Sequence, residues 1–269
     1  MLASDVCGVD DLYLALGVDD LSSTGLTLGT GWTRRWTTNW STGEAEVVCP
    51  VRDLPSVPVD SCQPVRRFGW RPRQRHRPGL QFLVSTGRHH GFESIAEQRL
   101  LVALDFAEDL VEVLSQPFAL RFATAAGPRT HVPDFLAVTC GGVWVFDVRP
   151  ADRVEDADRV CFAASAEAAL AVGWRYTVVT GWRNHVAVTL DTLSSQRRAL
   201  TDPLGLQRQL LARARCGRST FGDLVAATSL PAVARAHALH LLWHRRLGVD
   251  LGQPLTDRSL VWVTAGGER

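Results

Sequence analysis

Apolar residues recur at helical spacing through residues 94–106, and no glycine or proline interrupts them. After this predicted helix, β-branched and aromatic residues gather in three strand-like stretches, at residues 116–124, 131–139 and 143–149. An alanine-rich stretch, 157–172, predicts a second helix, and residues 175–180 predict a fourth strand. The order helix, three strands, helix, strand is typical of an α/β core with a mixed sheet.

The pattern changes near residue 200. Helical spacing then predicts three helices, at 204–216, 221–227 and 231–246, and two short strands around a turn complete the chain. Three helices followed by a β-hairpin indicate a winged-helix-like α+β domain. We therefore expect an N-terminal accessory region that is partly β, residues 1–63, a central α/β domain, 64–200, and a C-terminal winged-helix-like domain, 201–269.

Three tryptophans stand at even spacing in the N-terminal region, at Trp32, Trp36 and Trp40. This spacing fits one face of a strand or one flank of a helix, and the neighbouring threonines favour a strand. Such residues could stack on nucleic-acid bases, but packing against a neighbouring domain is their more common use.

The composition excludes several classes of protein. The chain has 269 residues, 46% hydrophobic residues and a net charge of +1. No apolar run approaches the roughly 18 residues of a membrane span, and the N-terminus is acidic where a signal peptide is basic. The six cysteines include no C-x-x-C pair, so we expect free thiols in a cytoplasmic protein without a membrane partner.

Positive charge is concentrated in two stretches, and all of it apart from histidine is arginine, since the chain contains no lysine. The first stretch has no acid, and its predicted DNA-binding residues are Arg66, Arg67, Arg71, Arg73, Arg75 and Arg77. The second stretch, 197–218, has six arginines and one acid. Each stretch alone could be a solvated surface, but two of them beside a candidate nuclease core favour contacts with phosphate.

A candidate catalytic pattern lies in residues 131–149, which read H-V-P-D-F-L-A-V-T-C-G-G-V-W-V-F-D-V-R. It has the outline of a PD-(D/E)xK nuclease core in which arginine replaces lysine. Strand alternation puts Asp147 and Arg149 on one face. A two-residue turn at residues 140–141 would set Asp134 opposite Asp147, whereas a turn at 141–142 would set it opposite Arg149. Facing carboxylates destabilise a sheet, which favours a bound cation.

Glu97 is the expected third acid, because it shares a helix flank with Leu101 and Leu104. Two alternatives remain open on these grounds. Ser94 and Glu97 also have the spacing of a capping box, in which Glu97 would bond the backbone at the helix start. Glu93, four residues earlier, is the rival metal ligand.

Other metal and nucleotide sites have little support. His237, His240 and His244 share a helix face, but no glutamate accompanies them as in H-E-x-x-H, so a metal there is not expected. The chain contains neither a P-loop nor G-x-S-x-G, which leaves nucleotide hydrolysis and α/β-hydrolase chemistry unsupported.

Residues 64–198 resemble the TnsA-like transposase endonucleases, which belong to the PD-(D/E)xK nuclease superfamily. The resemblance rests on P-V-R-R-F, T-G-R-H-H-G-F-E-S-I-A-E, L-D-F, S-Q-P-F, H-V-P-D-F, V-F-D-V-R-P and G-W-R-Y. It implies a restriction-endonuclease-like catalytic domain that cuts the 5′ strands at transposon ends. A DDE-type recombinase subunit would cut and join the 3′ ends.

The resemblance also implies a set of site residues. Glu97, Asp134 and Asp147 would be catalytic metal ligands, and Arg149 would take the place of the catalytic lysine. The interval from Glu97 to Gln116 of S-Q-P-F supports Glu97 over Glu93, and both Gln116 and Glu93 are accessory candidates. The implied cofactor is Mg²⁺, for which Mn²⁺ can substitute. The implied partners are double-stranded DNA at transposon ends, the recombinase and an AAA+ ATPase regulator, in the bacterial cytoplasm.

Arginine at position 149 affects the expected chemistry. Its fork of donors can stabilise charge on a phosphate, but with a pKa above about 12 it cannot act as a general base. Two other functions therefore remain open: a DNA-binding or assembly subunit of a transposition complex whose nuclease core has decayed, and a stand-alone restriction-type nuclease.

Overall fold

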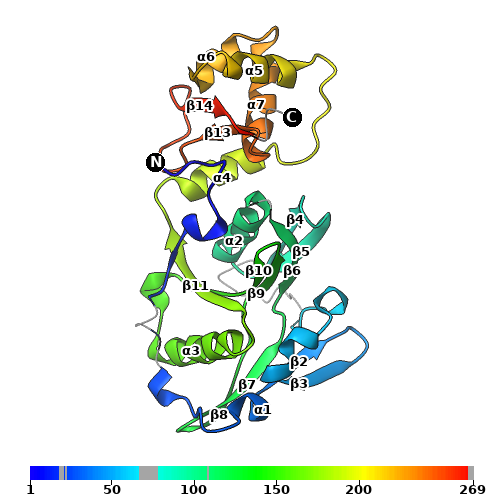
Figure 1. The fold of residues 1–269 in the computed structure, drawn as a ribbon, viewed down its shortest axis with the longest axis vertical. Helices are drawn as coiled ribbons and strands as arrows, with labels where there is room; N and C mark the ends of the chain where they lie inside the picture. Colours follow the sequence, from blue (N-terminus) through cyan, green and yellow to red (C-terminus); the bar gives the residue numbers. More distant parts are fainter. Residues whose placement is uncertain (18–20, 22, 67–77, 108, 266–269) are drawn as a thin grey trace. The chain divides into compact units, whose positions relative to one another are not determined.

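The computed structural model describes residues 1–17, 21, 23–66, 78–107 and 109–265 (Figure 1). The chain divides into two compact units. We call the first the site unit; it comprises Leu14–Gln98 and Asp109–Gly181. The terminal unit comprises Met1–Tyr13, Arg99–Glu108 and Trp182–Arg269. The boundaries expected at residues 63 and 200 do not coincide with this division.

A five-stranded mixed sheet forms the centre of the site unit. Its strand order is β1 (Tyr13–Ala15), β11 (Arg175–Trp182), β10 (Gly142–Val148), β9 (Phe135–Thr139) and β6 (Leu110–Ser115). β10 runs parallel to β11 and antiparallel to β9. The helix α3 (Asp156–Leu170) contacts β10. The expected α/β class with a mixed sheet is confirmed.

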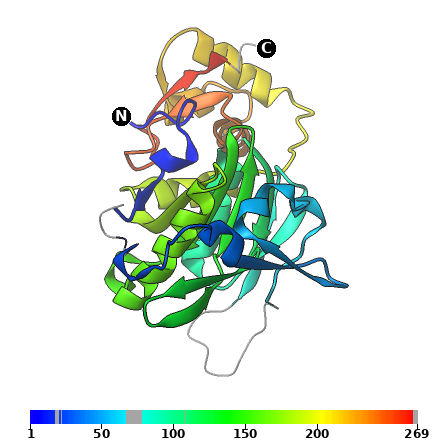
Figure 2. The same cartoon turned by 60° about the horizontal axis from the view of Figure 1, so that its bottom comes forward.

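A second sheet in the site unit is antiparallel, with the order β3 (Glu46–Pro50), β2 (Thr37–Ser41), β7 (Ala119–Thr124) and β8 (Gly127–His131). The hairpin of β7 and β8 can be followed in Figures 1 and 2. The prediction of one continuous strand over residues 131–139 is therefore wrong, because β8 and β9 belong to different sheets. Pro133 separates them, and a proline has no N–H to continue a ladder.

The tryptophans of the N-terminal region belong to the core of the site unit. Trp32 opens the short helix α1 (Trp32–Arg35), while Trp40 lies on β2, so they do not share one element. Trp36 and Trp40 are buried with Leu120 of β7 and Leu136 of β9. Packing, and not base stacking, is thus the role of these two rings, and it explains why residues before 64 fold with the candidate catalytic core.

Further elements of the site unit were not predicted from the sequence. The hairpin of β4 (Gly79–Leu83) and β5 (Arg88–Phe92) follows the first arginine-rich stretch. The strand β6 directly follows α2 (Ile95–Phe106), the predicted helix that carries Glu97.

The terminal unit contains α4 (Val186–Ser194), α5 (Leu206–Arg215), α6 (Phe221–Ala226) and α7 (Pro231–Trp243). Its sheet has the order β12 (Ser219–Thr220), β14 (Leu260–Val263), β13 (Leu247–Val249). The last three helices and the final hairpin agree with the sequence pattern; their assignment as a winged helix stays a prediction. Gly248 is required where it stands, because a Cβ there would lie 2.2 Å from Trp262 Nε1.

Within the described ranges, no helix combines the length and apolar character needed to cross a lipid bilayer.

Candidate active site

The register between β9 and β10 brings the two predicted aspartates together. Thr139 pairs with Gly142 and Phe135 with Phe146, so the intervening turn consists of residues 140 and 141. Asp134 lies just before β9, outside the paired residues, and its N–H bonds the carbonyl of Phe146, the partner of Phe135. Of the two turns that the sequence allowed, the one at residues 140 and 141 is observed, and the charge of Asp147 acts on the Asp134 carboxyl.

Backbone hydrogen bonds fix Asp134 between two strands. Its N–H donates to the carbonyl of Phe146 at 3.0 Å, and its carbonyl accepts from the N–H of Gln116 at 2.7 Å. The Asp134 carboxylate accepts from the N–H of Val148 at 2.7 Å. The side chain is therefore held against the end of β10, beside Asp147.

Two residues that sequence reasoning did not assign to the site hold Asp147. His131 Nε2 lies 2.9 Å from one carboxylate oxygen of Asp147 and 3.1 Å from the other. The hydroxyl of Tyr176 donates to the second oxygen at 2.6 Å. Asp147 itself is 3% exposed. Both partners occur in quoted motifs, H-V-P-D-F and G-W-R-Y, and Tyr176 pairs with Val145 on the face of the sheet that carries Asp147.

Charges around Asp147 shift the protonation of its partners. Burial lowers the pKa of His131, but attraction to Asp147 and the hydrogen bond to it outweigh this effect and raise the pKa to about 10. The imidazole is therefore protonated at neutral pH. Burial, and next the charge of Asp147, raise the pKa of Tyr176 well above its usual value, so this hydroxyl remains a donor.

Within this cluster, the pKa of the Asp134 carboxyl is raised. Burial is the main cause that raises its pKa well above the usual range of an aspartate, followed by the charges of Asp147 and Glu97. The bond from Val148 and the charge of His131 act in the opposite direction without cancelling the increase. Three carboxylates thus interact electrostatically, with one imidazolium to compensate them.

Glu97 serves as a cap at the start of α2 in this structure. Its carboxylate accepts from the N–H of Glu93 at 2.7 Å and from the Ser94 hydroxyl at 2.8 Å, while its own N–H donates to Ser94 Oγ at 3.2 Å. Burial raises the pKa of Glu97 in spite of these bonds. The capping alternative is observed, and the charge of Glu97 is one of the lesser causes that raise the pKa of Asp134. Glu93 contributes its backbone.

Gln116 is strained and buried next to Asp134. Its backbone φ is +46°, a conformation that side chains other than glycine rarely adopt, and the residue is 4% exposed. Within the described chain, its side-chain oxygen is buried without a hydrogen-bond partner. Buried orphan acceptors and strained backbone gather at functional sites, so Gln116 is consistent with an accessory role.

Arg149 points to a different partner from the one expected. Its Nε donates to Asp158 of α3 and to the carbonyl of Arg153, each at 3.0 Å. The Arg149 side chain is 40% exposed. β10 ends at Val148, so strand alternation no longer dictates the direction of the next side chain. The guanidinium is therefore bound to Asp158 and not to the carboxylate cluster.

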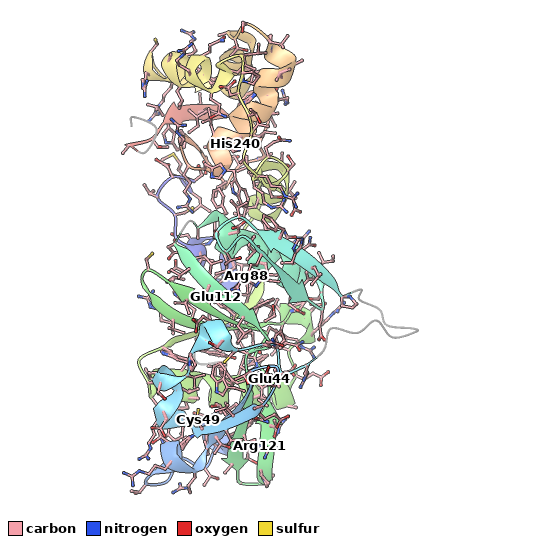
Figure 3. The ribbon with its side chains drawn as sticks, turned by 90° about the vertical axis from the view of Figure 1, so that its right-hand side faces the viewer. Glu44, Cys49, Arg88, Glu112, Arg121 and His240 are labelled. Carbon is pink, nitrogen blue, oxygen red and sulfur yellow. The ribbon has the colours of Figure 1, made fainter. Side chains whose placement is uncertain are left out.

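The remaining predicted residues are only partly described. Arg66 is exposed, whereas Arg67, Arg71, Arg73, Arg75 and Arg77 lie outside the described residues. Two of the three histidines near residue 240 have backbone partners. On α7, the Nδ1 of His240 (labelled in Figure 3) lies 2.7 Å from the carbonyl of Gln196, and just after the helix the Nε2 of His244 lies 3.0 Å from the carbonyl of Arg197. Neither contact resembles a metal site.

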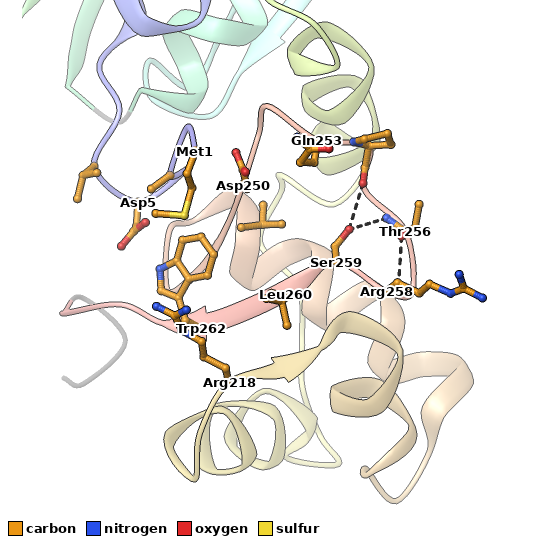
Figure 4. Close-up of a pocket in the computed structure, with 14 residues that line it drawn as sticks. Met1, Asp5, Arg218, Asp250, Gln253, Thr256, Arg258, Ser259, Leu260 and Trp262 are labelled. Atoms are coloured by element: carbon orange, nitrogen blue, oxygen red, sulfur yellow. Dashed lines mark hydrogen bonds between the residues drawn. The ribbon is translucent and has the colours of Figure 1, made fainter.

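Three pockets formed by described residues do not contain the carboxylates, and one of them, of about 330 Å³, is lined by Asp202, Gln207, Arg208, Leu211, Arg215 and Arg246. A pocket of about 670 Å³ in the terminal unit is lined by residues of the N-terminus, β14 and the β13–β14 loop, including Trp262, Leu260, Arg218 and Arg258 (Figure 4). A pocket of about 160 Å³ in the site unit lies beside the ion pair of Arg88 and Glu112 (Figure 3). No predicted metal ligand lines either pocket.

The donor chemistry of the cluster fits a hard divalent cation. Carboxylate oxygens are the ligands that Mg²⁺ prefers, and the three acids exceed the single imidazolium of His131 in charge. Among the described residues, however, no group of three or more His, Cys, Asp and Glu side chains is arranged to hold a metal ion. Both carboxylate oxygens of Glu97 accept hydrogen bonds within its cap, from the Glu93 N–H and the Ser94 hydroxyl.

Comparison with known proteins adds no family assignment: no protein-family model matches the chain, and no curated protein matches it.

Proposed function

We propose that this protein is an Mg²⁺-dependent DNA endonuclease, the subunit of a heteromeric transposase that hydrolyses the 5′ strands at transposon ends. In this proposal the site unit is a restriction-endonuclease-like catalytic domain of the TnsA-like kind, and the terminal unit includes a winged-helix-like domain. Double-stranded DNA and a DDE-type recombinase are its partners, and an AAA+ ATPase would regulate the complex.

The pairing of Asp134 with Asp147 carries the proposal. Neighbouring carboxylates on adjacent strands repel, and the charge of Asp147 adds to burial, the main cause, in raising the pKa of Asp134. A fold needs no such pair for its own stability, whereas a divalent cation between the two carboxylates would relieve the repulsion. Perturbed acids in a cluster are typical of catalytic sites.

Each residue of the cluster has a role in this proposal. Asp134 and Asp147 would bind the metal, and Glu97 would complete the site after leaving its cap. When bound, Mg²⁺ supplies a water of lowered pKa and polarises the phosphate. His131 and Tyr176 orient the Asp147 carboxylate through the hydrogen bonds described above. Arg149 would stabilise negative charge on the phosphate after exchanging Asp158 for it.

One observation favours a second candidate, a decayed nuclease that acts in assembly. The cation expected at the reacting phosphate, Arg149, is paired with Asp158. A decayed subunit would bind DNA and its recombinase but would not require Mg²⁺. Metal binding therefore discriminates the two candidates.

The test is an end-cleavage assay on a duplex with a transposon end, with and without the recombinase, and with Mg²⁺ or a chelator. Asp134→Ala should abolish Mg²⁺-dependent cutting of the 5′ strand while DNA binding remains. Asp152→Ala, at an exposed position of the same unit, is the matched control and should cut normally. Cutting that survives in Asp134→Ala would refute the nuclease assignment, and calorimetry without Mg²⁺ binding by the wild-type would favour the decayed subunit.

A further inference from the structure

The strand β14 of the terminal unit carries an open apolar surface. Leu260, Val261 and Trp262 follow one another along this strand. Val261 is buried, whereas Leu260 is 53% exposed and Trp262 is half-buried. Leu260 and Trp262 both line the pocket of about 670 Å³ (Figure 4). Because side chains alternate between the two faces of a strand, this pocket lies on the face of β14 that is turned away from the core of the unit.

Gly248 sets the orientation of the Trp262 ring. The two residues pair directly across β13 and β14. A Cβ at position 248 would lie 2.2 Å from Nε1, 2.4 Å from Cε2 and 2.9 Å from Cζ2 of the indole. Three distances this similar place the glycine under the face of the ring and not at its edge. One face of the indole therefore packs on the sheet, which leaves the opposite face for the pocket that Trp262 lines.

Two arginines flank this aromatic surface. Arg218 directly precedes β12, the strand next to β14, and Arg258 lies in the loop two residues before Leu260. Figure 4 shows Arg218 near Trp262 and Arg258 on the other side of Leu260. Both arginines are exposed and line the pocket. Among the described residues, no ion pair joins either of them to an acid. The pocket thus has a positive charge on each side of its apolar surface.

The two acids of the pocket do not neutralise these arginines. Oδ1 of Asp250 accepts from the N–H groups of Leu2 at 2.8 Å and Gly252 at 3.0 Å, so this carboxylate is occupied by the backbone. Asp5 is partly buried, and within the described chain one of its carboxylate oxygens is buried without a hydrogen-bond partner. A carboxylate repels phosphate but accepts from an amino group. Asp5 therefore suits the amino group of a nucleic-acid base better than it suits a phosphate.

We propose that this pocket binds a short segment of single-stranded DNA. We call it the β14 groove and define it by Arg218, Arg258, Leu260 and Trp262. An unpaired base stacks on the open face of Trp262, and backbone phosphates pair with the two arginines. An aromatic surface between basic groups is the arrangement with which proteins hold single strands. In a duplex each base is stacked between its neighbours and cannot reach such a surface. The inference goes beyond the proposed cleavage and rests on it only in naming DNA as the strand.

The expected effects follow from stacking and from counterion release. Stacking of one base on an aromatic side chain raises affinity by roughly 5- to 100-fold. Trp262→Leu keeps an apolar side chain but removes the ring, and should lose affinity by about this factor. Trp262→Phe keeps a ring and should recover most of the loss. Each phosphate contact with a single strand contributes about 0.7 to the slope of log affinity against log salt, so removing both arginines should lower the slope by about 1.4.

The experiment measures the anisotropy of a labelled single-stranded DNA of about 12 nucleotides with the full chain, in a chelator, over a range of salt concentrations. The test variants are Trp262→Leu, with Trp262→Phe as its rescue, and the double variant Arg218→Gln, Arg258→Gln. The matched controls lie in the same unit but outside the pocket: Trp182→Leu, at a partly buried ring, and the exposed pair Arg183→Gln, Arg213→Gln. A duplex and an RNA of the same sequence are measured in parallel.

We expect the wild-type to bind the single strand, both test variants to weaken this binding, and the controls to stay within twofold of the wild-type. Trp262→Leu should leave the affinity for the duplex unchanged. Circular dichroism melts identify any variant that fails to fold, and the exposed arginine pair tests the groove independently of Trp262. The inference is overturned if the wild-type does not bind the single strand, if the folded test variants bind it normally, or if the controls weaken it equally. It is also overturned if Trp262→Leu weakens duplex binding to the same extent, or if the RNA binds more tightly than the DNA.

This test separates the two proposals because it contains no divalent metal. Single-strand binding that depends on the β14 groove supports the inference even if Asp134→Ala shows that the chain does not cut DNA. Conversely, Mg²⁺-dependent cutting together with normal single-strand binding by the test variants would retain the nuclease and refute the groove.

Discussion

Replacing Asp134 with asparagine should raise the melting temperature of the metal-free protein, although it removes a residue of the candidate active site. The asparagine side chain has nearly the same shape and can still accept from the Val148 N–H, which lies 2.7 Å from the present carboxylate. The substitution removes the negative charge of Asp134, which lies beside Asp147 and Glu97. The charges of these two residues help to raise the pKa of Asp134. Active sites often give up stability for function in this way.

The magnitude can be worked from the geometry. Side chains that interact across adjacent strands lie roughly 5 Å apart, and two charges at that distance repel by about 3 kcal/mol at an effective dielectric constant of about 20. The imidazolium of His131 offsets part of this repulsion, and weakening the charged bond from Val148 costs about 1 kcal/mol. A net gain of about 1 kcal/mol remains, which corresponds to a shift of roughly 2–4 °C.

The gain should depend on pH. Because the pKa of Asp134 is raised in the folded chain, the folded state binds this proton more tightly than the unfolded state. The wild-type therefore loses stability as pH rises from about 3.9, the ordinary value of an aspartate, towards the raised value. Asparagine has no proton to lose, so the difference in melting temperature should widen as pH rises above about 4.

The assay is thermal unfolding followed by circular dichroism, in a chelator and with Mg²⁺. Mg²⁺ should stabilise the wild-type, since a ligand that binds only the folded state raises its stability, and should have little effect on Asp134→Asn. Asp152→Asn, an exposed position, is the control and should behave as the wild-type does. The reasoning fails if Asp134→Asn melts below the wild-type without metal, or if Mg²⁺ stabilises both equally.

Three further outcomes are expected. In a chelator the wild-type should lose stability as pH rises through about 10, the pKa of His131. A raised histidine pKa stabilises the fold fully below about pH 6.5 and no longer above the folded-state pKa. Thermal melts of His131→Gln should lack this loss. Gly248→Ala should cost about 1–3 kcal/mol in urea unfolding of the terminal unit, since its Cβ would lie 2.2 Å from Trp262 Nε1, and a neutral result would contradict this contact. Trp40→Ala, at a fully buried ring, should cost about 3–5 kcal/mol, and a loss below about 1 kcal/mol would mean that the ring is not in the core.

Local rules predicted part of the centre of the candidate site. Side chains alternate along a strand, and a two-residue turn fixes which residues face each other. These rules placed Asp134 and Asp147 on one face but left open whether the turn lies at residues 140–141, as observed, or at 141–142. The helix that carries Glu97 could also be predicted, because its apolar residues recur at helical spacing without interruption.

Long-range pairing could not be read in the same way. The sequence gives no sign that the chain changes sheets between β8 and β9, apart from Pro133, or that residues 37–41 pair with β7. His131 was therefore assigned to the strand that carries Asp134, whereas it ends β8, and in that position it contacts Asp147. The side chain of Arg149 was placed on the Asp147 face by strand alternation, although β10 ends at Val148, one residue earlier.

Rigid and exchangeable parts of the site are held by different kinds of contact. Asp134 and Asp147 are fixed by backbone bonds and by a buried imidazolium, which a cation need not disturb. Glu97 is held by a cap, worth about 1 kcal/mol, and Arg149 by a half-exposed ion pair with Asp158, worth at most about 1 kcal/mol. The two residues that the nuclease proposal requires to move are thus the two whose present bonds are cheapest to break, so the pairing of Arg149 with Asp158 weighs little against that proposal.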